Sequence, residues 1–136
     1  MNDVYVLSNK KHSNLLFSSS FLFLISCILS FIYNIYDYCF LLFCLFFTSI
    51  NYWRKPTLSL RRNIDICCAI VSFTYHKYTL FSNINIISII CLYIGISFYF
   101  FGIFLSRNEK IFMSVVSHML FHFFTNMSCI IYIIYF

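Results

Sequence analysis

Two histidines, His118 and His122, have the residue type and spacing that point most directly to chemistry in this sequence. They are four positions apart, so in a helix both imidazoles lie on one face, one turn from each other. Such a pair can share a divalent metal ion, and zinc is the cofactor that it indicates. The surrounding segment is apolar, where ionisable groups are costly and need an explanation. Interhelical hydrogen bonding without a metal is the alternative.

Asp65 is the candidate that could assist this pair. If its helix runs in the same direction as the helix of His118 and touches it, both side chains lie towards the same membrane surface. Asp65 can instead pair locally with Arg61 or Arg62, which precede it by one helical turn or less. His76 follows Asp65 at a distance of about 16 Å along a helix. We therefore expect His76 to be an interfacial residue and a poor partner for Asp65.

The elements that carry these residues are predicted from composition and run length. The chain of 136 residues is 62% apolar and 10% charged, whereas a soluble domain has roughly 25% charged residues. A soluble domain of this size could not bury so much apolar surface, so lipid must cover it. Apolar runs long enough for spanning helices occupy residues 15–33, 38–53, 64–79, 84–105 and 111–136. We predict an all-α, multi-pass transmembrane bundle of about five helices, forming one domain (15–136) after a cytoplasmic tail (1–14).

Two of these runs, 15–33 and 64–79, are less certain from their sequence to be spanning helices than the others. The first follows two lysines, as a signal peptide would, but it is longer than a signal core and lacks a small-residue cleavage site. We expect it to be an uncleaved helix. The run 64–79 is the weakest, because it is barely long enough and contains Asp65 and His76.

The basic residues set the predicted orientation, because cytoplasmic loops carry an excess of Lys and Arg. With five spans and a cytoplasmic N-terminus, Lys77 is the only basic residue on the outer side. The inner segments hold eight: Lys10, Lys11, Arg54, Lys55, Arg61, Arg62, Arg107 and Lys110. If residues 64–79 fail to span, the ratio becomes seven to two. The C-terminus is predicted on the side opposite to the N-terminus.

The same charges indicate the partners. The net charge of +5 is not arranged as a basic face interleaved with exposed aromatics, so nucleic acid is not expected. The lipid bilayer is the predicted partner, and the inner segments can contact anionic headgroups. The side chains expected to do so are Arg54, Lys55, Arg61 and Arg62.

Small residues in the run 84–105 predict a helix-packing surface, because they let neighbouring backbones approach closely. They are Ser88, Cys91, Gly95, Gly102 and Ser106. The seven cysteines form no metal-binding or disulfide pattern, and we expect them to be buried as small apolar side chains.

The segment Ser117 to His122 resembles the HxxxH of the last helix in the alkaline ceramidase and adiponectin-receptor superfamily of membrane hydrolases. That resemblance implies that His118 and His122 bind zinc and that Asp65 and Ser49 take part in catalysis. The zinc would lower the pKa of a bound water and polarise a lipid amide or ester carbonyl. The chain departs from the family in having Trp53 where a third zinc-binding histidine is expected, and five helices in place of seven.

Two classes of function therefore remain open. The first is a small multi-pass integral membrane protein that acts through helix packing, homo- or hetero-oligomerisation or a partner, and it predicts that His118 and His122 tolerate Gln or Asn. The alternative is a reduced zinc-dependent lipid hydrolase, which predicts bound metal. A transporter ranks last, because no central segment is interrupted by Pro or paired Gly. Phosphate-binding glycine loops and nucleophile elbows are absent from the sequence.

Overall fold

The computed structural model describes residues 9–82 and 85–136, and within these ranges the chain is helical, with no β-strand. The helices are α1 (Lys10–Ser19), α2 (Phe21–Ile32), α3 (Tyr36–Trp53), α4 (Leu60–Ser82), α5 (Ile86–Arg107) and α6 (Ile111–Tyr135). Because α1 and α2 form one rod that is interrupted at Ser20, the described part has five helical rods. The predicted all-α bundle of about five helices is confirmed. Residues 1–8 of the predicted tail and position 84 lie outside the described ranges.

The first rod shows why its start and its interruption fall where they do. The side chain of Asn9 accepts a hydrogen bond from the backbone N–H of Lys11 at 2.9 Å, which caps α1. At the interruption, the hydroxyls of Ser19 and Ser20 both donate to the carbonyl of Leu16 at 2.9 Å. Serine side chains that bond back to the preceding turn compete with the helix ladder and bend it. The first rod therefore begins before residue 15 and is divided into two helices.

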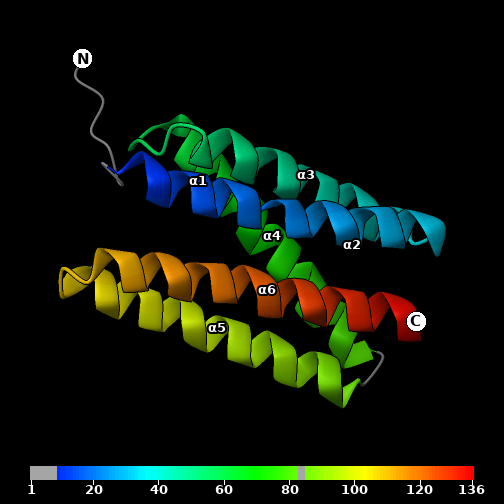
Figure 1. Ribbon diagram of the computed structural model, residues 1–136. Coiled ribbons are helices and arrows are strands. Elements are labelled where there is room, and N and C mark those ends of the chain that lie inside the picture. Colours follow the sequence, from blue (N-terminus) through cyan, green and yellow to red (C-terminus); the bar gives the residue numbers. More distant parts are fainter. Residues whose placement is uncertain (1–8, 83–84) are drawn as a thin grey trace.

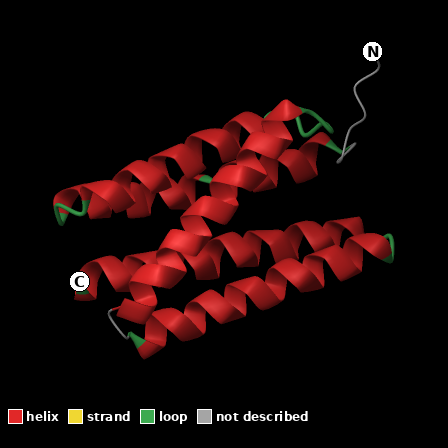
Figure 2. Cartoon of the chain, turned by 180° about the vertical axis from the view of Figure 1, so that it is seen from behind, coloured by secondary structure: helices red, strands yellow, loops and turns green. Residues whose placement is uncertain are grey.

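The rods alternate in direction and form two antiparallel pairs. One pair consists of α1–α2 with α3, and the other of α5 with α6, while α4 crosses obliquely between the pairs (Figures 1 and 2). Helix α4 packs mainly along α3, whereas α1 and α2 also pack against α6. Three-residue turns close both pairs, and each contains a left-handed residue, Asn34 (φ 61°) or Glu109 (φ 58°). Such turns join helices that lie side by side.

The two ends of the bundle differ in charge. The start of α1, the α3–α4 loop and the α5–α6 turn lie at one end, and the α2–α3 turn and the C-terminus lie at the other (Figure 1). Contacts support this grouping: the Ser13 hydroxyl donates to the Trp53 carbonyl, and the His12 and Phe112 rings are 5.9 Å apart. The first of these ends, here called the basic end, holds Lys10, Lys11, Arg54, Lys55, Arg61, Arg62, Arg107 and Lys110.

In the described part of the chain, three helical segments are long and apolar enough to cross a membrane, namely Lys10–Ile32, Ile86–Arg107 and Ile111–Tyr135. Membrane association follows from them. Helices α3 and α4 are not among these three. Helix α4 begins at Leu60, four residues before the predicted run, so Arg61 and Arg62 lie in the helix and not in the loop.

Small residues of α5 make the seam with α6, as the sequence predicted. A Cβ atom added at Gly95 would lie 2.8 Å from Cγ2 of Thr125 and 3.2 Å from its backbone nitrogen. Three of the predicted packing residues, Ser88, Gly95 and Gly102, are buried. The other two, Cys91 and Ser106, are half-buried and exposed, respectively.

The prediction that the cysteines are buried is correct only in part. Cys27 and Cys129 are buried, Cys67 is exposed and the other four are intermediate, and all seven are free thiols. Cys67 lies on the face of α4 that points away from its neighbours, where the apolar thiol is compatible with lipid.

Candidate functional site

A cavity of about 750 Å³ lies between the two helix pairs. Helices α3, α4, α5 and α6 supply nearly all of its lining, and α2 adds Phe23. The four site residues predicted from the sequence, Ser49, Asp65, His118 and His122, all line it. The fold therefore brings together side chains from three helices that are far apart in the sequence. We call this space the interhelical cavity.

His122 is fixed by contacts with the first rod. It is 3% exposed, and its Nδ1 atom is 2.8 Å from the Ser19 hydroxyl. The Phe23 ring lies edge-on to the imidazole, with 5.2 Å between ring centroids. His122 thus joins α1 and α2 to α6, which is the interhelical hydrogen bonding that the sequence offered as the alternative to a metal site.

His118 differs from its neighbour in having no hydrogen-bond partner among the described residues. Its ring is 4.8 Å from that of His122 and 5.4 Å from that of Trp53, measured between centroids. Trp53 therefore lies beside the histidine pair, where the family resemblance requires a third histidine. The indole nitrogen of Trp53 is buried and has no hydrogen-bond partner among the described residues. It carries an N–H and no lone pair for a metal.

Asp65 and Ser49 each have a neutral partner. Oδ1 of Asp65 accepts a hydrogen bond from the Thr48 hydroxyl at 3.1 Å. Asp65 makes no ion pair with a described residue, so the predicted local pairing with Arg61 or Arg62 is wrong. The two hydroxyls of Ser49 and Ser20 are 3.0 Å apart. Both predicted catalytic side chains therefore hold neighbouring helices together.

The histidine pair does not fit a catalytic zinc ion. Such sites use three protein ligands and leave one position open for water or substrate. Among residues 9–82 and 85–136, no three His, Cys, Asp or Glu side chains come together as a group that could hold a metal ion. His118 and His122 supply two imidazoles, and Trp53 cannot supply the third ligand. We therefore derive no metal-dependent step.

His76 was predicted as an interfacial residue, and this prediction is wrong. It is 4% exposed and lines the interhelical cavity. Its Nδ1 is 2.5 Å from the Tyr38 hydroxyl, and its Nε2 is 2.8 Å from the Ser128 hydroxyl. Ser128 in turn donates to the Ser88 carbonyl at 2.7 Å. The resulting His76 network joins α3, α4, α5 and α6 at the end opposite to the basic end.

The sequence carried only a weak signal for this network. His76 lies on a polar stripe of its helix with Asp65 and Ser72, which indicates an interior face. Its partners are 38 and 52 residues away, so no local spacing reveals them. Two further residues of the cavity, Arg62 and Arg107, were assigned only to the basic surface.

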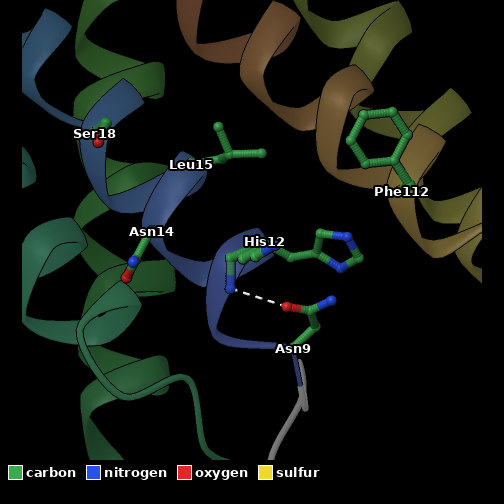
Figure 3. A pocket seen from close by; sticks show the side chains of 7 residues that line it. Asn9, His12, Asn14, Leu15, Ser18 and Phe112 are labelled. Carbon is green, nitrogen blue, oxygen red and sulfur yellow. Dashed lines mark hydrogen bonds between the residues drawn. The ribbon is translucent and has the colours of Figure 1, made fainter.

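A second, shallower hollow lies at the basic end, beside the start of α1 (Figure 3). The His12 imidazole points across it towards Phe112, and Asn9 forms the cap of α1 below it (Figure 3). This hollow is where α1 docks against the start of α6, and it brings no further charged cluster together.

Fold and cavity together define a class: a helical bundle of membrane type, with an interior that combines apolar walls and hydrogen-bonded histidines. Comparisons with protein-family models, curated proteins and solved structures find no match to this chain. The bundle and its cavity are therefore the features that bear on function.

Proposed function

We propose that this protein is an integral membrane protein with five spans, which takes one lipid chain from the bilayer into its interhelical cavity. The observation that carries the proposal is the combination of a cavity of about 750 Å³ with an apolar, exposed rim. Pockets for single small molecules measure roughly 300–1,000 Å³. The role is one of binding, which belongs to the accessory class of functions.

The rim of the cavity supports entry from the side. Ile66 and Ile70 of α4 and Phe100 and Ile103 of α5 line the cavity and are also 37–64% exposed. Helix α4 packs along α3, and α5 is not among its main packing partners in the described part of the chain. The apolar opening between α4 and α5 would face the hydrocarbon in a membrane, so a lipid could enter without crossing water.

The length of the cavity suits an acyl chain. Its lining extends along α4 from Arg62 to His76, a distance of about 21 Å at the helical rise. One leaflet contributes half of a hydrocarbon core that is about 30 Å thick. A chain of leaflet length therefore fits beside α4.

Five crossings are supported by the direction of the rods. Helix α3 runs antiparallel to the first rod, α4 crosses obliquely away from its end, and the α3–α4 loop lies at the basic end (Figure 1). With three crossings, this loop would lie on the side opposite to Lys10, whereas with five crossings it lies on the same side. The C-terminus is opposite to Lys10 in both cases, so only the loop distinguishes them.

The topology is tested with single cysteines introduced into a cysteine-free chain. Replacements at Ser59 of the loop and at Asn108 of the α5–α6 turn are labelled in intact cells with a membrane-impermeant maleimide. Five crossings predict that both positions react only after the membrane is permeabilised. Labelling of Ser59→Cys in intact cells, with Asn108→Cys still protected, would disprove five crossings.

Lipid uptake is tested by filling the cavity. Ala69 lines the cavity, whereas Cys67, two residues away on the same helix, is exposed and does not. We expect Ala69→Phe to lose the lipids that remain bound in native mass spectrometry, and Cys67→Phe to keep them. Equal retention by both variants would refute the proposal.

A lipid hydrolase is the second candidate, supported by the shared cavity of Ser49, Asp65, His118 and His122. The missing third metal ligand among the described residues weighs against it. The zinc measurement described in the Discussion separates the two candidates.

A further inference from the structure

The charged residues that line the interhelical cavity lie at one end of it. Arg62 is in the first turn of α4 and Arg107 is the last residue of α5, and both line the cavity at the basic end. Neither forms an ion pair with any residue in the described ranges. Among the described residues, Asp65 is the only carboxylate in the lining, and it accepts a hydrogen bond from the Thr48 hydroxyl. Two guanidinium groups and one carboxylate thus line the basic end of an otherwise apolar space.

Arg62 is also held close to the wall of the cavity. It is half-buried and interacts with the Tyr52 side chain, which lines the same space. An arginine in this position keeps its charge and presents several N–H donors in a planar fork. That geometry matches the oxygens of a phosphate group.

The remaining polar side chains deeper in the cavity are mostly occupied. His122 bonds to Ser19, Ser49 to Ser20, and His76 to Tyr38 and Ser128. The charged side chains that can bind a ligand, Arg62 and Arg107, therefore lie at the basic end, whereas the deeper part of the cavity has mainly apolar walls. An amphiphile with a negative headgroup and an apolar chain complements both parts at once.

We propose that the interhelical cavity binds an anionic phospholipid of the inner leaflet, with its phosphate held between Arg62 and Arg107 and one acyl chain along α4. This assignment rests on the proposed uptake of a lipid chain and adds the chemical class of the headgroup. The second acyl chain stays in the bilayer, outside the opening between α4 and α5. Arg54 and Arg61 do not line the cavity and are not part of the site.

The experiment compares lipid retention by the purified full chain in native mass spectrometry. Phosphatidylglycerol and phosphatidylcholine with identical acyl chains are supplied in equal amounts. The wild-type chain is expected to retain the anionic lipid about tenfold better, the factor that corresponds to 1.4 kcal/mol of selective binding. The double variant Arg62→Gln, Arg107→Gln is expected to lose this preference while it still retains phosphatidylcholine.

The matched control is the double variant Arg54→Gln, Arg61→Gln, which removes the same charge from the same end and should keep the preference. Arg62→Lys, Arg107→Lys should keep part of it, which shows that charge and not folding is the cause. Loss of the preference in the control, or its survival without Arg62 and Arg107, would overturn the assignment.

Two further arms separate the possible sources of failure. In the first, palmitate is supplied as a competitor. If the chain retains palmitate but not phosphatidylglycerol, and if this retention depends on Arg62 and Arg107, the ligand is not a phospholipid. If Ala69→Phe retains both phospholipids as the wild type does, the proposed cavity binding itself fails. If Ala69→Phe loses both but the arginine variants change nothing, only the headgroup assignment fails.

Discussion

The α5–α6 seam and the interhelical cavity are built from similar side chains but are packed very differently. In the seam, Gly95 lies so close to Thr125 that a single added carbon would collide with it. At the end opposite to the basic end, the His76 network joins the seam to α3 and α4, and both imidazole nitrogens of His76 have partners. In the cavity, His118 has no hydrogen-bond partner among the described residues. His76 and His118 both line the cavity, but of these two only His118 has no hydrogen-bond partner among the described residues.

The largest expected effect comes from removing the histidine that is fully bonded. His76→Ala deletes two hydrogen bonds and leaves the buried hydroxyls of Tyr38 and Ser128 with fewer partners, which should cost about 2–3 kcal/mol. The His118→Ala variant is the control and should cost less, because it removes ring contacts but no hydrogen bond. Reversible unfolding in mixed detergent measures both. Equal losses would mean that the two hydrogen bonds of His76 add little to stability.

A smaller effect is expected from a single methyl group in the seam. Gly95→Ala forces a contact at 2.8 Å with Cγ2 of Thr125, and such overpacking should cost about 1–3 kcal/mol. At Gly102 the nearest atom, the Ser114 carbonyl oxygen, would be 3.4 Å away. Gly102→Ala should therefore be neutral or slightly stabilising, since alanine favours a helix by up to about 1 kcal/mol. If Gly95→Ala unfolds at the same detergent fraction as the wild type, the seam is looser than described.

The smallest effect concerns metal. Two imidazoles without a third ligand should retain zinc far below one ion per chain. Elemental mass spectrometry of the wild type and of the variant His118→Gln, His122→Gln should give the same low value. Near-stoichiometric zinc in the wild type that disappears in the variant would favour the hydrolase candidate over lipid binding.

Much of the candidate site could be located from the sequence, but its internal bonding could not. The spacing of His118 and His122 and the polar stripe of Asp65 identified side chains that do line one cavity. The sequence could not show that His122 forms a hydrogen bond with Ser19, which is 103 residues away. It also assigned Arg62 to a loop, because the apolar run starts after it, whereas the helix begins at Leu60.

By itself, the sequence determined the number and approximate limits of the helices. Long apolar runs, helical periodicity and caps such as Asn9 are local properties, and each acts within a few turns of the chain. Only the tertiary structure decided which polar side chains form hydrogen bonds with each other and which remain without a partner. His76, His118 and His122 have the same side chain in similar apolar contexts, yet their roles differ. The reason is that a hydrogen bond needs a partner within about 3 Å, and the packing of distant helices sets that distance.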